Sequence, residues 1–412
     1  MKSLTITLCF TILLLSCKEQ KQVDSSEIIS EQYTQEDYDF LAIGNPEKMS
    51  SASKRALRNN YHKNEEWFGT FRNHELKGDV GYEKGVIRRD PTMVIQVNDL
   101  YYTWYSKSVG KTYGFGTGDP EKKVFPWDKT EIWFATSKDG WVWKEQGVAV
   151  TFGPKGEYDD RSVFTPEILA HEGKYYLVYQ CIQFPYLNRS FNTVGMSIAD
   201  SPNGPWKRLA TPILEASKDG EWLGEEDSRF AVKSQGSFDS QKVHDPTLLY
   251  YKDKFYLYYK GERMGERNTA GGREIRWGVA IADNITGPYV KSEYNPITHS
   301  GHELCVWKYM DGIAMVSSAD GPERQTIQYA PDGINFEIMS YVNQVPSAMG
   351  LVTTLDNDKH PTEALSWGLQ HLSKNYPGKP WWAGDQYLAR FSFSRNRNTK
   401  SEFAESKKES DQ

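Results

Sequence analysis

The sequence has few cysteines, no marked excess of either charge and only one apolar run. Its 412 residues include four Cys, and acidic residues slightly outnumber basic ones for a net charge of −6. Cys9 and Cys17 belong to the amino-terminal signal described next, and the remaining two, Cys181 and Cys305, are too few for a disulfide framework or a four-cysteine zinc site. The charge balance gives no reason to expect a nucleic-acid partner. HExxH and EF-hand patterns are also missing, so the sequence leaves any metal site unknown.

The apolar run lies at the amino terminus. Lys2 precedes the apolar stretch from Leu4 to Leu15, which is too short to span a bilayer as a helix and is typical of a secretion signal. The stretch ends in Leu-Leu-Ser before Cys17, which resembles a bacterial lipobox. We therefore predict a lipoprotein signal peptide over residues 1–16 and lipidation of Cys17. The polar residues that follow predict an outer-membrane lipoprotein, facing either the periplasm or the surface, with a flexible tether over residues 17–33.

What the chain has in abundance is aromatic residues: 13 Trp, 25 Tyr and 18 Phe make up 14% of it. Many of them recur in one pattern, a turn followed by an aromatic strand, at residues 98–105, 172–179 and 252–259, with a weaker copy at 310–316. Each copy is followed by a second recurring strand and a turn. A repeated pair of hairpins indicates four-stranded blades, so we predict an all-β fold, a five-bladed β-propeller over residues 79–395.

The segments that flank the predicted propeller differ from it. Residues 34–78 favour a small helical element, with one helix starting at Thr34 and a second from Lys54 to about Phe71. Two short helices bury little surface alone, so we expect them to dock on the main domain or on a second copy. The fifth blade is degenerate, with strands expected at 351–353, 363–369 and 387–393. The charged residues 396–412 predict a disordered tail.

An acidic residue lies before the first strand of each of four repeats: Asp90, Glu167, Asp245 and Glu303. The first three are separated by 77 and 78 residues, which predicts equivalent depth in successive blades. First strands of blades line the central channel, so these carboxyls would converge there. With no compensating lysine cluster, we expect them to raise one another's pKa, as a glycosidase needs for one protonated and one ionised group.

Two kinds of side chain accompany the acids. His244 and His302 each directly precede one of them, which suggests hydrogen bonds to a sugar hydroxyl or proton transfer near neutral pH. Trp127 lies in a long insertion between strands of the first repeat and is a candidate for stacking on a sugar ring, although it could equally cover a blade edge.

With these residues in place, the chain resembles glycoside hydrolase family 117, and is similar to members from gut Bacteroides. The strings that carry the resemblance are long: residues 61–67, 88–91, 159–167, 242–246 and 300–303. The family comprises exo-acting α-1,3-L-neoagarooligosaccharide hydrolases, or α-1,3-(3,6-anhydro)-L-galactosidases. The resemblance implies a five-bladed propeller, a homodimer that exchanges its amino-terminal helices, and release of 3,6-anhydro-L-galactose from the non-reducing end of neoagarobiose and longer neoagaro-oligosaccharides, with inversion.

The resemblance also implies roles for individual residues. Asp90 would be the general base, Asp245 would orient the sugar and tune the acid, and the acid would be His302 or Glu303. The sugar pocket would be lined by Thr165, Gln180 and His244, with Trp127 on the galactose side. The sequence requires no cofactor, although a divalent cation near the site is implied by the resemblance.

Two other functions stay open at this point. An arabinan- or xylan-directed propeller glycosidase would place acids on the same blades. A non-catalytic glycan-binding lipoprotein is the third reading, which the converging acids Asp90, Asp245 and Glu303 disfavour.

Overall fold

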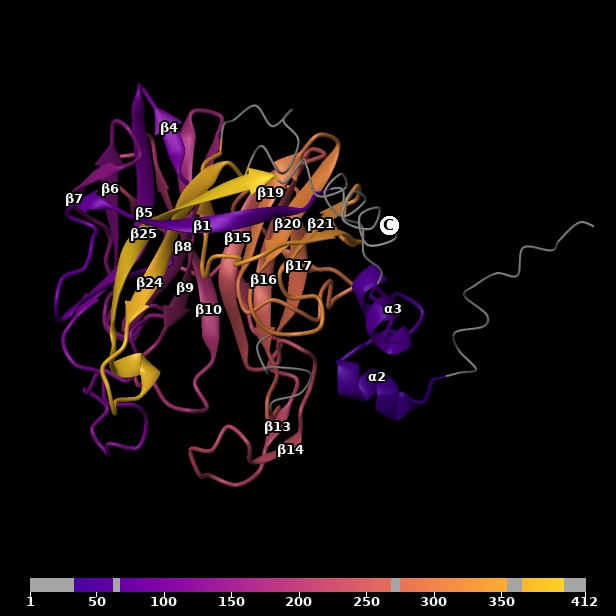
Figure 1. The fold of residues 1–412 in the computed structure, drawn as a ribbon. Coiled ribbons are helices and arrows are strands. Elements are labelled where there is room, and N and C mark those ends of the chain that lie inside the picture. Colours follow the sequence, from indigo (N-terminus) through magenta and orange to yellow (C-terminus); the bar gives the residue numbers. More distant parts are fainter. Residues whose placement is uncertain (1–32, 62–66, 268–274, 354–364, 396–412) are drawn as a thin grey trace, which may run out of the picture.

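The computed structural model describes residues 33–61, 67–267, 275–353 and 365–395, and most of the regular secondary structure in this part of the chain is β-strand (Figure 1). The predicted all-β class is therefore confirmed. The signal peptide, Cys17, most of the tether and the carboxy-terminal tail lie outside the described residues. Among the described helices, none is long and apolar enough to cross a membrane.

The strands pair in successive antiparallel units that follow the predicted repeats. The first unit holds β3 (Val86–Arg89), β4 (Ile95–Val97), β5 (Leu100–Val109), β6 (Glu131–Ser137) and β7 (Val142–Val150), with β2 (Lys77–Gly78) parallel to β7. The second holds β8 (Ser162–His171), β9 (Lys174–Ile182) and β10 (Asn192–Ala199), edged by β11 (Lys207–Arg208) and β12 (Leu214–Glu215).

The remaining units continue this order. The third holds β15 (Lys242–Tyr251), β16 (Lys254–Glu262), β17 (Arg276–Ala282) and β18 (Val290–Lys291), and the hairpin of β13 (Glu221–Trp222) and β14 (Val232–Ser234) precedes it. The fourth holds β19 (Leu304–Tyr309), β20 (Gly312–Ser317), β21 (Thr326–Ala330) and β22 (Glu337–Tyr341). This arrangement fits the predicted propeller, and the count of five blades stays a prediction.

The last unit joins the two ends of the domain. It contains β23 (Gly350–Leu351), β24 (Trp367–Lys374) and β25 (Asp385–Arg395), and its outer strand is β1 (Gly69–Glu75) from the amino-terminal side. In Figure 1 the purple β1 lies alongside the yellow β25. The prediction that the second helix reaches Phe71 is wrong. Phe71 is fully buried against the rings of Phe391 and Phe393, so it belongs to the sheet core.

The second helix is shorter than predicted, and each helix begins directly after its capping residue. Thr34 caps α2 (Gln35–Leu41) with a complete capping box, and Ser50 caps α3 (Ser51–Arg58). The helical element docks on the same chain: Ser50 Oγ donates to the carbonyl of Pro296 at 2.7 Å. Figure 1 shows both helices beside the sheets rather than within them.

The repeated aromatic strands form the core, as the sequence predicted. Trp104, Tyr105, Tyr179, Tyr258 and Tyr259 are all fully buried. Burial of a large aromatic side chain contributes about 1.5–3 kcal/mol, so rows of them stabilise a fold without disulfides. Consistent with that, the two cysteines in the described residues, Cys181 and Cys305, are buried and free.

Candidate active site

The site is built on a distortion repeated in three units. Asp90, Thr165 and Asp245 each precede a proline and each has a positive φ, of 50°, 47° and 45°. Non-glycine residues rarely adopt this conformation, which costs on the order of 1–3 kcal/mol at each position and is concentrated at functional sites. At Thr165 and Asp245 the ladder to the next strand shifts register at this point. The distortion takes these residues out of regular pairing and places them together.

The equivalence predicted for Glu167 is therefore wrong. The residue that matches Asp90 and Asp245 is Thr165, two positions earlier, because the pairing resumes at Glu167 just as it resumes at Thr247. Glu167 is buried, and its Oε1 accepts hydrogen bonds from the backbone N–H groups of Met93 and Ile168 at 2.8 Å. It joins β8 to the backbone of Met93 in the first unit and does not line the cavity described next.

A cavity of about 720 Å³ opens where the units meet. That volume is within the range of small-molecule sites. Asp90 is 3% exposed and lies just beneath the lining, in contact with Arg89, Thr165 and His371, which all face the cavity. The other residues predicted for the site, Glu167 apart, line the cavity directly: Trp127, Thr165, Gln180, His244, Asp245, His302 and Glu303.

Asp90 is surrounded by groups that favour its ionised form. Arg89 Nε lies 2.6 Å from its Oδ2, Thr165 Oγ1 donates to the same oxygen at 3.1 Å, and His371 Nδ1 lies 3.3 Å from Oδ1. Burial opposes ionisation, but the Arg89 guanidinium and His371 outweigh it and hold the pKa of Asp90 well below its usual range. The expectation that the site acids all raise one another's pKa is therefore wrong for Asp90.

Asp245 and Glu303 behave in the opposite way. Burial raises the pKa of Asp245 to about 7, against the Lys260 ammonium 2.5 Å from its Oδ2, and the charge of Glu303 adds to the rise. Burial likewise raises the pKa of Glu303, which Lys260 opposes and the charge of Asp90 reinforces. The site thus holds an ionised carboxylate beside two carboxyls that retain protons more readily.

The two predicted histidines have different surroundings. His302 is the more open, with 43% of its side chain exposed, and its ring nitrogens lie 3.7 Å from Glu303 Oε1 and from Asp320 Oδ2. His244 is buried, and its Nδ1 lies 2.9 Å from Gln180 Nε2 while its Nε2 lies 3.3 Å from Glu262 Oε2. His302 is thus accessible from the cavity, whereas His244 and Gln180 are held as a hydrogen-bonding pair.

Aromatic rings form one wall of the cavity. Trp127 is half-buried, with Phe125 stacked on it at 4.8 Å, Trp381 at 6.1 Å, and its Nε1 donating to the Tyr186 hydroxyl at 3.0 Å. Trp381, from the 3₁₀ helix η1 (Trp381–Ala383), is 59% exposed. The exposed ring of this stack is therefore Trp381, and Trp127 supports it from the cavity wall.

A cation site is not evident in these surroundings. Within residues 33–61, 67–267, 275–353 and 365–395, no group of three or more His, Cys, Asp or Glu side chains is placed to hold a metal ion. The divalent cation that the family resemblance implies stays a prediction, and the chemistry considered below uses none.

Sequence reasoning missed Lys260, His371 and Trp381. Lys260 carried a readable signal, because it follows the last tyrosine of its aromatic strand just as Gln180 and Ser106 follow theirs. The strands pair these positions with the residue just before each distorted one, and Ser106 Oγ accepts a hydrogen bond from Thr165 N–H at 2.7 Å. His371 and Trp381 lie in the degenerate last unit, where no repeat pointed to them.

One comparison with solved structures is close. Zg3597, a family 117 glycoside hydrolase from the marine bacterium Zobellia galactanivorans, is 36% identical to this chain with a TM-score of 0.65. The match covers 80% of this chain and 92% of Zg3597.

More distant structures share the fold alone. A structure described as a glycoside hydrolase has 14% identity and a TM-score of 0.52, over 80% of this chain and 93% of its own. A structure described as a complex of BT0996 and RGII has 13% identity and a TM-score of 0.51 over the same shares. No protein-family model and no curated protein matches the sequence.

Proposed function

Because the chain belongs to glycoside hydrolase family 117, we propose that it is an inverting exo-glycosidase that cleaves the α-1,3 bond of neoagarobiose and neoagaro-oligosaccharides and releases 3,6-anhydro-L-galactose. The observation that carries the proposal is the contrast between Asp90, held ionised, and Asp245 with Glu303, whose pKa values are raised. Inverting hydrolysis needs one carboxylate to activate water and one acid to protonate the leaving oxygen.

Asp90 takes the role of general base. Its Oδ2 is occupied by Arg89 and Thr165, and its buried Oδ1 lies 3.3 Å from His371 Nδ1. That oxygen is the acceptor for a proton from water. As water gives up this proton, its oxygen forms a bond to the anomeric carbon from the face opposite the departing sugar, and the configuration inverts.

The acid is supplied by the His302–Glu303 pair. One of the two donates a proton to the bridging oxygen while the bond from the anomeric carbon to that oxygen breaks, so the galactose side leaves as a neutral alcohol. Asp245 and Lys260 adjoin Glu303 and set its proton affinity. His302 Nε2 lies 3.7 Å from Glu303 Oε1, so one of the two can donate the proton while the other supports the donor.

Binding of the two sugars is assigned to two different groups of lining residues. Thr165, Gln180 and His244 offer hydrogen bonds beside the acids, where the anhydrogalactose would lie. The Trp127–Trp381 stack provides a flat apolar surface for the galactose side, since sugar rings present C–H faces to aromatic rings.

The test is hydrolysis of neoagarobiose followed by proton NMR from the first minutes. The proposal predicts galactose together with anhydrogalactose, and a first-formed anomer of inverted configuration. Arabino- and xylo-oligosaccharides are incubated in parallel. Cleavage of those sugars alone would indicate the arabinan- or xylan-directed enzyme, and binding without cleavage of any would indicate a glycan-binding protein.

The cellular setting is proposed on the sequence alone. Export by residues 1–16 and lipidation of Cys17 would anchor the enzyme at the outer membrane, and exchange of the helical element would make a homodimer. Labelling with a radioactive fatty acid should be lost in Cys17→Ala, and light scattering of the soluble form reports the dimer.

A further inference from the structure

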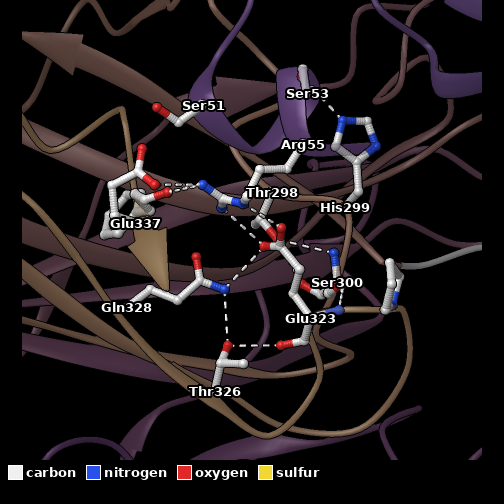
Figure 2. A network of polar contacts seen from close by, with 12 residues as sticks. Ser51, Ser53, Arg55, Thr298, His299, Ser300, Glu323, Thr326, Gln328 and Glu337 are labelled. Atoms are coloured by element: carbon white, nitrogen blue, oxygen red, sulfur yellow. Dashed lines mark hydrogen bonds and ion pairs between the residues drawn. The ribbon is translucent and has the colours of Figure 1, made fainter. Parts of the chain in front are cut away.

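Helix α3 is joined to the catalytic domain by a buried ion pair. Arg55 Nε donates to Glu323 Oε1 at 2.7 Å and its second guanidinium nitrogen reaches Oε2 at 3.2 Å, a two-point contact (Figure 2). The Glu323 side chain is 1% exposed and that of Arg55 is 11% exposed. A fully desolvated carboxylate depends on its partner far more than an exposed one.

Glu323 is in turn bonded to the segment that precedes the acid pair. Its backbone N–H donates to Ser300 Oγ at 2.7 Å, and its carboxylate accepts from Gln328 Nε2 at 3.1 Å. Figure 2 shows these bonds meeting at one residue between α3 and the sheet. The helix reaches the same segment a second time, because Ser53 Oγ lies 3.0 Å from His299 Nε2.

The segment held in this way carries the acid pair. The backbone N–H of His302 donates to Ala319 O at 2.7 Å, and that of Gly301 donates to Asp320 O at 2.9 Å. Glu303 N–H donates to Ser318 Oγ at 3.0 Å. Residues 300–303 and 318–323 therefore form two strips of chain bonded along their length, with the cavity at one end and Arg55 at the other.

We propose that Arg55 is a positioning residue for His302 and Glu303. Through Glu323 it fixes the two strips, residues 300–303 and 318–323, and so determines the position of the proton donor. The amino-terminal helical element is then part of the catalytic apparatus as well as a docking or dimer element. The inference rests on the proposed function for the reaction it is measured on. Displacement of a catalytic group by about 1 Å can cost on the order of 100-fold in rate.

The experiment compares Arg55→Lys and Arg55→Ala with Lys54→Ala, an exposed neighbour on the same helix. On neoagarobiose, Arg55→Ala is expected to lower kcat on the order of 10-fold or more with little change in KM. Arg55→Lys, which keeps the charge but loses the two-point contact, should recover part of the rate. Lys54→Ala should match the wild type.

A second readout does not depend on activity. The imidazole signals of His302, assigned by their loss in His302→Ala, are followed by NMR over pH in each variant. Glu303, Asp320 and Lys260 are the charged groups that face His302 or its backbone. Arg55→Ala should shift the His302 titration and broaden its signals, while Lys54→Ala leaves them in place. Glu323→Gln, which retains hydrogen bonds, provides the milder variant if Arg55→Ala does not fold.

Two results would overturn the proposal. The first is a folded Arg55→Ala or Glu323→Gln protein with wild-type kcat and unchanged His302 signals. The second is a loss of stability without any change in His302, which would make Arg55 an anchor only. If the wild type itself fails to cleave neoagarobiose, the NMR arm still tests the inference while the proposed function fails.

Discussion

Asp90 and Asp245 occupy the same distorted position in two units of one fold, yet their surroundings drive their pKa values apart. Both precede proline and both have positive φ, and their side chains are 3% and 13% exposed. Asp90 has a guanidinium, a hydroxyl and an imidazole around it. Asp245 has one ammonium and a second carboxyl, and its pKa rises to about 7. The backbone conformation is the same at both positions, so the difference in pKa comes from the neighbouring side chains.

The difference lies in the number of compensating groups. Loss of hydration raises the pKa of either buried carboxyl, and a nearby cation lowers it. Around Asp90 the cationic partners outweigh burial. Around Asp245 and Glu303, two acids share Lys260 between them, so burial and mutual repulsion prevail. Equivalent positions in a repeated fold can therefore hold an ionised carboxylate in one unit and a carboxyl with a raised pKa in another, because their neighbouring side chains differ.

Removal of the base should have the largest effect. Asp90→Asn keeps the shape and the left-handed backbone, which Asn tolerates, but cannot accept a proton from water. We expect kcat on neoagarobiose to fall by roughly 10²- to 10⁴-fold while substrate binding is retained. Steady-state kinetics and calorimetric titration measure the two quantities.

A matched control is Asp99→Asn, an exposed aspartate with φ of 63° in a turn. It makes the same substitution in the same backbone conformation and should leave kcat unchanged. Wild-type turnover in Asp90→Asn would show that another group is the base.

The acid pair should give the next largest effect and can be resolved by pH. Comparison of His302→Ala with Glu303→Gln asks which variant loses the alkaline limb of the kcat/KM profile, since that limb reports deprotonation of the acid. The variant without the true donor should be slower by roughly 10²-fold with a flat alkaline side. Two variants that both keep the limb would place the acid elsewhere.

Replacement of the two cations beside the carboxyls, Arg89 and Lys260, should produce smaller changes. Each replacement should move a different limb of the pH profile of kcat/KM. Arg89→Gln removes the charge that keeps Asp90 ionised, so the pKa of Asp90 rises and the acidic limb of the profile moves to higher pH. Lys260→Met raises the pKa of Asp245 and Glu303, so the alkaline limb moves to higher pH. Each shift should be about one unit or more. Movement of the same limb in both variants would contradict the assignment.

The aromatic wall should matter least. Trp381→Ala removes the exposed ring of the stack and should raise KM by about 2- to 10-fold with little change in kcat, because the ring contributes uniform binding rather than proton transfer. Tyr82→Ala, which removes an exposed ring away from the cavity lining, is the control. An unchanged KM in Trp381→Ala would remove this ring from the substrate site.

The sequence predicts the strands and much of the site because both repeat. The aromatic strands around Trp104, Tyr179 and Tyr258 recur, and so do the proline-linked positions Asp90 and Asp245. Glu167 was misplaced because equal spacing along the chain ignores the two-residue difference that the distorted ladder absorbs. The contribution of Arg89 and His371 to the pKa of Asp90 depends on contacts across units, which spacing alone does not report.

The opposed protonation of Asp90 and its neighbours is the feature on which the proposed reaction depends. Carbon-13 NMR of labelled aspartate and glutamate carboxyls tests it most directly, with assignments from Asp90→Asn, Asp245→Asn and Glu303→Gln. We expect the Asp90 signal to stay at its ionised position from neutral pH down through about pH 4, while the Asp245 signal titrates near pH 7. Titration of Asp90 in the ordinary carboxyl range, or an Asp245 that is ionised throughout, would contradict it.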